Sequence, residues 1–222
     1  MLWPRLHPNR AVAISCLLAS CLLASGCLSN VPLNPTAEGL SFPARLPLSI
    51  GWYSSAAFQA YEIEDRYQGF VMPIGRASAT LFQEITAMLF EQSPPVLARP
   101  SLTGPAAAVR AVIEPTIVMV DLGSGMLQSS ELFWAEIAYR FILSSPQGDV
   151  IASWTVTGVG ITEANGSLSR HGYQGQAVDM AIRNAGARLL DVFQGVPEVR
   201  QWLGGVGVEV VRDQPVRFGH TP

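Results

Sequence analysis

The sequence contains no lysine, and charged residues make up only 14% of the 222-residue chain. All 14 basic residues are therefore arginines, and they are spaced singly along the chain. Nucleic-acid binding requires a clustered basic face, so the sequence predicts no nucleic-acid partner. Ordinary soluble domains carry about 25% charged residues. The low charge therefore favours a protein that exposes some apolar surface to something other than water.

Cysteine is confined to the first 27 residues, at Cys16, Cys21 and Cys27. The rest of the chain can therefore form no disulfide, no thiolate metal site and no cysteine nucleophile. Beyond the N-terminal segment, no apolar run is long enough to cross a bilayer. The hydrophobic content of 49% excludes a disordered chain. We expect one globular domain.

The N-terminus is organised like an export signal. Arg5 and Arg10 form a positive n-region, and residues 11–23 form an apolar stretch with the length of a signal-peptide h-region. The sequence therefore predicts a signal peptide over residues 1–26. A conventional secretory leader with incidental cysteines is the alternative.

The segment Leu23-Ala24-Ser25-Gly26-Cys27 resembles the lipobox of bacterial lipoproteins, whose cysteine carries a diacylglycerol. The usual lipobox has Leu three residues before the cysteine, where this chain has Ala24. Cys21 is the alternative acylation site, because Leu18 holds the expected place before it. We favour Cys27, which has the longer apolar stretch and a glycine before it.

The resemblance to lipoproteins implies a location as well as a modification. The two or three acyl chains of a lipoprotein cysteine make membrane attachment effectively permanent. In that family an Asp directly after the cysteine retains the protein in the inner membrane, and this chain has Leu28 there. The resemblance therefore implies an outer-membrane protein that faces the periplasm. Residues 27–46 contain Pro32, Pro35 and Pro43 and few periodic apolar positions, which predicts an extended lipid-anchored tether.

Residues 47–211 contain the periodic apolar patterns of a single domain, and residues 212–222 are predicted to be a flexible tail. Alternating or β-branched segments predict strands, and apolar residues at helical spacing predict two main helices. A turn at Pro146-Gln147-Gly148 predicts an antiparallel hairpin. The order indicates an α+β fold with a mixed, mostly antiparallel sheet and both helices on one face. The expected strands are 48–53, 96–98, 109–120, 132–143, 150–159 and 206–211, and the expected helices are 76–91 and 173–193, followed by a helical turn over 197–203.

This element order resembles the small α/β domains of outer-membrane auxiliary lipoproteins. They include the transport-auxiliary lipoproteins of lipid ABC systems, the lipopolysaccharide-assembly lipoproteins, the curli-secretion lipoprotein and the N-terminal domain of TolB. The resemblance covers residues 47–203 and the lipobox, without a specific internal motif. It implies a fold class and leaves the role open.

No motif in the chain specifies a reaction. Beyond the leader there are two histidines, His171 and His220, and neither has a carboxylate or a second histidine nearby in sequence. We therefore predict a protein that is not an enzyme, with no catalytic residues, no metal and no cofactor.

One sheet face has the composition of a binding site. If the Pro146-Gln147-Gly148 turn fixes the hairpin register, Arg140 lies opposite Trp154, and Trp134 shares their face. Two tryptophans with an arginine beside them are typical of binding hot spots. The structural alternative is a cross-strand pair, or burial beneath the tether or the tail.

The sequence thus predicts a lipid-anchored periplasmic accessory protein. It would dock onto an envelope complex for transport, assembly or secretion through the face that carries Trp134, Arg140 and Trp154. The alternative is a carrier of lipid or another small apolar molecule in a pocket between the sheet and the helices. The sequence leaves the partner and the oligomeric state open.

Overall fold

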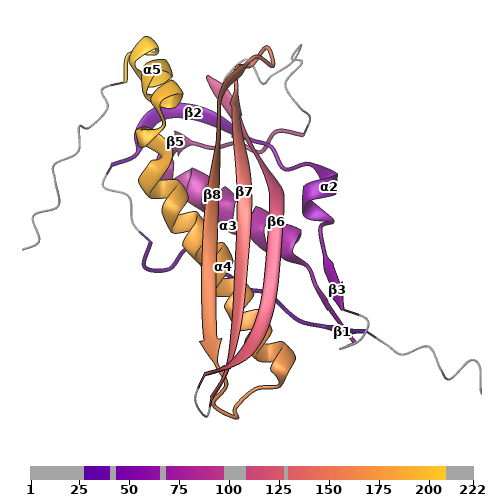
Figure 1. Ribbon diagram of the computed structural model, residues 1–222. Helices are drawn as coiled ribbons and strands as arrows, with labels where there is room; N and C mark the ends of the chain where they lie inside the picture. Colours follow the sequence, from indigo (N-terminus) through magenta and orange to yellow (C-terminus); the bar gives the residue numbers. More distant parts are fainter. Residues whose placement is uncertain (1–27, 41–43, 66–68, 98–108, 128–129, 209–222) are drawn as a thin grey trace, which may run out of the picture.

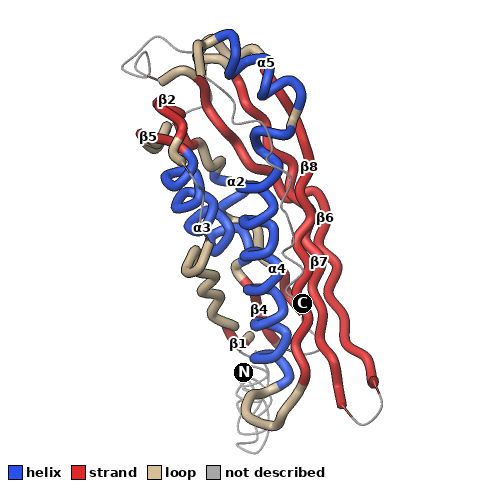
Figure 2. Tube along the Cα trace, turned by 90° about the vertical axis from the view of Figure 1, so that its left-hand side faces the viewer, coloured by secondary structure: helices blue, strands red, loops and turns tan. Residues whose placement is uncertain are grey.

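The structure, a computed structural model, describes residues 28–40, 44–65, 69–97, 109–127 and 130–208. Its largest element is a five-stranded sheet with the strand order β5-β2-β6-β7-β8. Figures 1 and 2 show the helices on one face of the three long strands. The long strands β6 (Ala111–Leu127), β7 (Ser130–Ser144) and β8 (Val150–Glu163) are antiparallel, and β2 (Leu46–Trp52) runs parallel to β6 and to β5 (Phe90–Gln92).

Two long helices cover the inner face of this sheet. They are α3 (Ile74–Leu89) and α4 (Arg170–Val192), and a 3-10 turn η2 (Phe193–Gly195) and α5 (Pro197–Gly205) follow α4. The Ser169 side chain caps α4 by accepting a hydrogen bond from the Gly172 N–H at 3.1 Å. The predicted α+β fold with a mostly antiparallel sheet is confirmed.

A second, smaller sheet lies at one end of the body. It has the order β1-β4-β3, formed by β1 (Ser29–Asn30), β4 (Phe70–Met72) and β3 (Ile63–Asp65). A short helix, α2 (Ala56–Gln59), lies between β2 and β3 in the chain. This sheet connects the first described residues to the rest of the protein.

The space between the sheet and α3 is filled by aromatic side chains. The ring of Phe82 meets those of Tyr139 and Phe141 edge-on, with centroids 4.8 and 5.2 Å apart. The Tyr139 hydroxyl lies 2.7 Å from Ser78 Oγ, which itself donates to the Ile74 carbonyl, so Tyr139 is the donor. Burial raises the pKa of Tyr139, which keeps it neutral. This packing gives the predicted pocket for an apolar molecule no support.

Helix α4 and strand β8 are in backbone contact. A Cβ atom built on Gly158 would lie 1.9 Å from the Ala181 carbonyl oxygen, and one built on Gly160 would lie 2.0 Å from that of Ala177. Glycine on the strand therefore meets a helix face whose small residues repeat every fourth position. This contact sets the distance between α4 and the sheet.

The prediction of an extended tether is wrong for residues 28–40, which we call the N-terminal strap. Its strand β1 pairs in parallel with β4, and Val31 and Leu33 are buried in the hydrophobic core. Gly175 of α4 makes room for Val31, because a Cβ there would lie 2.7 Å from Val31 Cγ1. A proline-rich segment is typical of an extended spacer, but the apolar side chains of this one pack into the hydrophobic core.

Polar contacts to α4 also hold the strap. The Asn34 N–H donates to both carboxylate oxygens of Asp179, at 3.0 and 3.3 Å, and the Arg183 guanidinium donates to the Glu38 carbonyl. Burial raises the pKa of Asp179 to about 6, although the bond from Asn34 acts to lower it. The strap is therefore part of the folded body.

Two of the predicted strands are also wrong. Val96 and Leu97 lie outside any strand, and only Pro95 forms an isolated bridge, to Trp52; the edge strand is β5 instead. Residues 206–208 form a turn after α5, where Gly207 has φ +78°. Residue 98, residues 209–211 of the other predicted strand, and the tail 212–222 lie outside the described residues.

Candidate docking face

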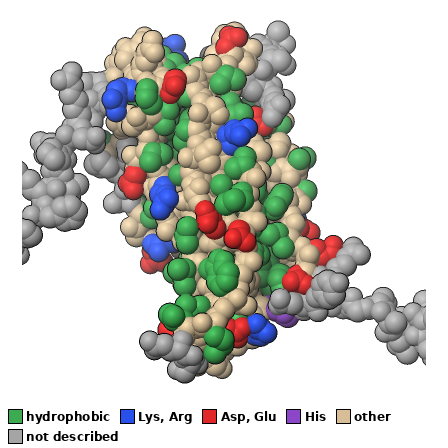
Figure 3. All heavy atoms as spheres, viewed as in Figure 1, with side chains coloured by type: hydrophobic (Ala, Val, Ile, Leu, Met, Phe, Trp, Pro, Cys, Tyr) green, Lys and Arg blue, Asp and Glu red, His purple; other side chains and the backbone are tan. Residues whose placement is uncertain are grey.

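The side of β6, β7 and β8 that faces away from α3 and α4 is the outer face. Alternation along β7 places Trp134, Glu136 and Arg140 there, while Phe133, Tyr139 and Phe141 point inward. Figure 3 shows hydrophobic side chains along this side of the protein, with charged side chains between them. The apolar side chains on it that are more than a third exposed include Met119, Trp134, Val159 and Ile161.

Trp134 is held flat on this face by two glycines. Its Cα is opposite Gly123 in β6, and a Cβ on Gly123 would lie 2.0 Å from Trp134 Cζ2; a Cβ on Gly125 would lie 3.5 Å from Cζ3. The Gln174 side-chain amide donates to the Trp134 carbonyl at 2.8 Å. The indole therefore has a fixed position in the folded protein, and 37% of the residue remains exposed.

Trp154 does not share the face of Trp134, so the predicted arrangement is wrong. Trp154 is opposite Phe141, and its ring stacks on that of Phe141 with centroids 5.8 Å apart. It also contacts Phe193 after α4, on the inner face. Its indole Nε1 is buried and has no hydrogen-bond partner among the described residues. The predicted alternative of a structural role fits Trp154.

A β-bulge causes this change of face. The turn forms as predicted, with the Ser145 N–H donating to the Asp149 carbonyl at 2.7 Å and Gly148 at φ +97°. Ser144 then pairs with Val150, but Leu143 pairs with Ala152, so Ile151 is an extra residue on β8. Every later side chain of β8 is thereby moved to the other face.

Arg140 remains on the outer face, with different neighbours from those predicted. It is opposite Thr116 of β6 and Thr155 of β8, and it is exposed. Two acidic residues, Asp121 and Glu136, are opposite each other closer to Trp134. Like charges in directly opposed positions destabilise a sheet pair. Among the described residues, neither carboxylate has an ion-pair partner.

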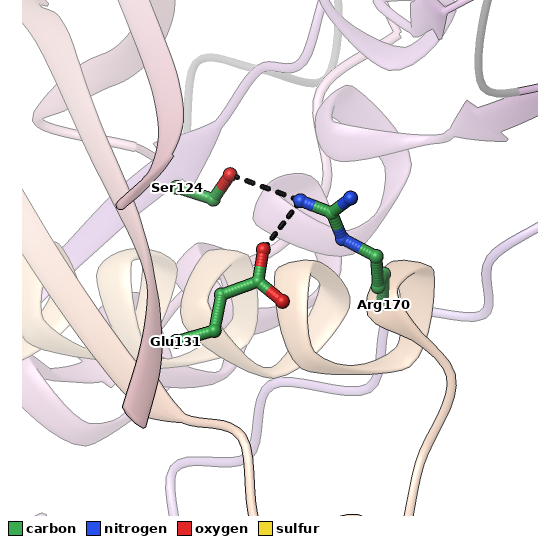
Figure 4. Close-up of polar contacts among 3 residues, drawn as sticks. All are labelled: Ser124, Glu131 and Arg170. Carbon is green, nitrogen blue, oxygen red and sulfur yellow. Dashed lines mark hydrogen bonds and ion pairs between the residues drawn. The ribbon is translucent and has the colours of Figure 1, made fainter. Parts of the chain in front are cut away.

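A polar cluster fixes the far end of the β6–β7 hairpin to the start of α4. Figure 4 shows the Arg170 guanidinium in an ion pair with Glu131 and 3.4 Å from Ser124 Oγ. The same guanidinium lies 5.8 Å from the centroid of the Phe133 ring, which stacks on Tyr173. Sequence reasoning missed this cluster, because its members are 39 and 46 residues apart.

Tyr173 organises the loop before α4. Its hydroxyl accepts hydrogen bonds from the N–H groups of Asn165, Ser167 and Leu168, at 3.0, 2.7 and 3.1 Å, and donates to Asn165 Oδ1 at 2.6 Å. Desolvation by burial acts to raise the pKa of Tyr173, but these hydrogen bonds outweigh it and the pKa lies below its ordinary value. The hydroxyl has no further capacity for a substrate, which makes Tyr173 structural.

The described residues show no catalytic arrangement around His171. Its ring packs on that of Phe70, with centroids 4.9 Å apart. No group of three or more His, Cys, Asp or Glu side chains that could hold a metal occurs among the residues the structure describes. No helix in the described ranges is long and apolar enough to cross a membrane. Cys27 and His220 lie outside those ranges, so lipidation and the absence of enzymatic activity stay predictions.

Comparison with known proteins gives weak likenesses only. No protein-family model and no curated protein matches the chain. Among solved structures, it is similar to protein XCC0632 of the DUF330 family from Xanthomonas campestris, with a TM-score of 0.46, 13% identity, and coverage of 78% of this chain and 95% of that one. A protein described as a homolog of the neuraminyllactose-binding hemagglutinin from Helicobacter pylori gives a TM-score of 0.47, 8% identity, and coverage of 79% and 98%.

A minor lipoprotein from Acinetobacter baumannii gives a TM-score of 0.35 at 8% identity, with coverage of 68% of this chain and 94% of that one. Several of the similar solved structures are described as bacterial lipoproteins. Identities of 8–13% with TM-scores below 0.5 establish neither a common family nor a common function.

Proposed function

We propose that this chain is a lipid-anchored, non-enzymatic accessory protein of the bacterial envelope, which docks a partner protein through its outer face. Anchoring is supported by the signal-peptide pattern and the lipobox-like segment that ends at Cys27. By the same resemblance, the acylated protein would reside in the outer membrane and face the periplasm.

The observation that carries the docking role is the preorganised indole of Trp134 on a sheet face that no described helix or strand covers. A rigid aromatic side chain with exposed apolar neighbours is typical of an interface anchor, because little side-chain entropy is lost on binding. Ile161 is directly opposite Trp134 on β8 and is 55% exposed. Together they offer a partner an apolar centre.

The acidic pair suggests the chemistry of the partner. Asp121 and Glu136 repel each other in the free protein, so a basic group of the partner would gain their attraction and remove that repulsion. We therefore propose a partner with an apolar side chain for Trp134 and an Arg or Lys beside it. A charged rim around an apolar centre is the ordinary anatomy of such interfaces.

The test is crosslinking in intact cells followed by recovery of the partner, for wild type, Trp134→Ala and Arg140→Ala. Leu97→Ala is the matched control, because it also truncates an exposed apolar side chain but lies beyond the Trp52 to Pro95 bridge, off the outer face. We expect Trp134→Ala to lose most of the crosslinked partner, Arg140→Ala to lose less, and Leu97→Ala none. Full recovery with a folded Trp134→Ala protein would refute the docking face.

Glu136→Gln separates docking from folding. Removing one of two opposed carboxylates should stabilise the free protein by about 0.2–1 kcal/mol, whereas it should weaken partner recovery. If Glu136 had only a structural role, Glu136→Gln would not both raise the stability of the protein and lower the recovery of the crosslinked partner.

Mass spectrometry of the N-terminal peptide from detergent-extracted protein tests the anchor. We expect a diacylated or triacylated Cys27 as the first residue. A peptide that begins before residue 27 and carries no fatty acid would contradict the proposed anchor, and acylation at Cys21 would move it.

A further inference from the structure

The end of the body that carries the strap also carries exposed apolar side chains. They are Leu28, Met126, Leu127 and Leu168, with exposed fractions of 38%, 70%, 60% and 43%. We call this surface the apolar end. Leu28 begins the strap, Met126 and Leu127 end strand β6, and Leu168 precedes the first turn of α4.

A continuous series of contacts places these side chains at one end of the protein. Ser29, next to Leu28, pairs with Phe70, and the ring of Phe70 packs on that of His171 at the start of α4. Arg170 is bound to Glu131, whose position in the β6–β7 ladder is opposite Met126. Figures 1 and 2 show β1, the start of α4 and the end of the β6–β7 hairpin at the lower end of the body.

The strap leaves almost no chain between this end and the proposed anchor. Cys27 directly precedes Leu28, and the Ser29 N–H already donates to the Gly69 carbonyl at 2.7 Å. One residue spans at most about 3.6 Å. A diacylglycerol on Cys27 lies in the bilayer, so Leu28 is held within a few ångströms of the lipid headgroups, and the rest of the apolar end lies on the same end of the body.

We infer that the apolar end makes direct contact with the bilayer that holds the anchor, so that the body stands end-on on the lipid surface. The inference rests on the proposed anchoring at Cys27. Exposed apolar side chains that cannot leave the headgroup region bury their surface among the lipids.

Charge at this end limits the depth of the contact. Arg170 is already paired with Glu131, so its charge is compensated. Glu163 at the end of β8 is exposed, and Asp65 of β3 is opposite Phe70 in the small sheet. Carboxylates avoid the hydrocarbon core, and therefore the contact is shallow and mainly apolar.

The test uses the acylated full-length protein, reconstituted into vesicles of phosphatidylethanolamine with a minor fraction of phosphatidylglycerol. Leu127→Cys places a thiol for a fluorescent probe on the apolar end, and Val150→Cys is the matched control. Val150 is 64% exposed at the β7–β8 turn, the other end of the long strands. Removal of the leader with Cys16 and Cys21 and acylation of Cys27 leave the new thiol as the only free one.

Brominated lipids report whether each probe touches the bilayer. We expect them to remove most of the fluorescence of the probe at position 127 and little of that at position 150. If the protein floats with the vesicles but the probe at position 127 is not quenched, the lipid contact is wrong and the anchor stands. Equal quenching at positions 127 and 150 would also contradict the lipid contact. A wild-type chain that does not float with the vesicles would overturn the anchor and the contact together.

Discussion

Gly158→Ala should destabilise the protein, because the added methyl group has no space. The new Cβ would lie 1.9 Å from the Ala181 carbonyl oxygen and 2.6 Å from the Ala185 nitrogen, both in the backbone of α4. Side-chain rotation cannot relieve a backbone clash, so the helix must move away from β8. That movement disturbs the packing of Ala181 and Ala185, which are fully buried.

The expected cost follows from known overpacking. Extra methyl groups in packed cores cost about 1–3 kcal/mol, and Ala regains about 0.5–1 kcal/mol over Gly within a strand. The two effects together leave a net loss of about 0–2.5 kcal/mol. Because the clash is with backbone atoms, we expect the upper part of this range, about 1–2.5 kcal/mol, which lowers the midpoint of thermal unfolding by roughly 2–10 °C for a chain of this size. Circular dichroism during heating measures this shift.

Gly204→Ala is the matched control for Gly158→Ala. Gly204 lies in α5, and a Cβ there would meet no atom within 4 Å. Helix propensity predicts unchanged or slightly higher stability for this variant. If both variants unfolded at the wild-type temperature, the close contact between β8 and α4 would be wrong.

The remaining predictions concern the strap. Leu33→Ala should cost about 2–3 kcal/mol in urea unfolding, because the side chain is buried in the core; a free tether would show no change. Asp179 has a pKa of about 6 in the folded protein, above the ordinary value of 3.8, so the stability it contributes is present below pH 4 and is lost as the pH rises through 6. Between pH 4 and 7.5, the free energy of unfolding of the wild type should therefore fall by about 1 kcal/mol more than that of Asp179→Asn. This value is reduced because Asp179 is partly exposed. Identical pH profiles of urea midpoints for wild type and variant would contradict it.

Long periodic segments were predictable from sequence. The patterns over 132–143, 150–159 and 173–193 correspond to β7, β8 and α4, each of which extends a few residues further. Pro115 lacks a backbone N–H donor, which favours a position at a sheet edge or a bulge. It lies in β6 just beyond Ile113, the last residue paired with β2, where the strand has become an edge on that side.

The candidate site was only partly predictable, because a single extra residue decides the face. The turn chemistry of residues 146–148 correctly placed the hairpin, and Ser144 pairs with Val150 as that turn requires. The bulge at Ile151 has no distinct sequence signature, since Val-Ile-Ala is an ordinary strand segment. It moves Trp154 inward and leaves Trp134, on the unshifted strand, outside.

The strap could not be recognised from local pattern for a similar reason. Val31 and Leu33 alternate with Pro32 and Asn34, and so few residues have too short a pattern to distinguish a buried strand from a spacer. Their burial depends on distant partners, Gly175 of α4 and the β4 strand. Because the strap is part of the folded body, a chain anchored at Cys27 would have no flexible segment between the membrane and the body. With the proposed anchor at Cys27, the fold would set the orientation of the outer face relative to the lipid, and the proposed partner would reach Trp134 along the membrane surface.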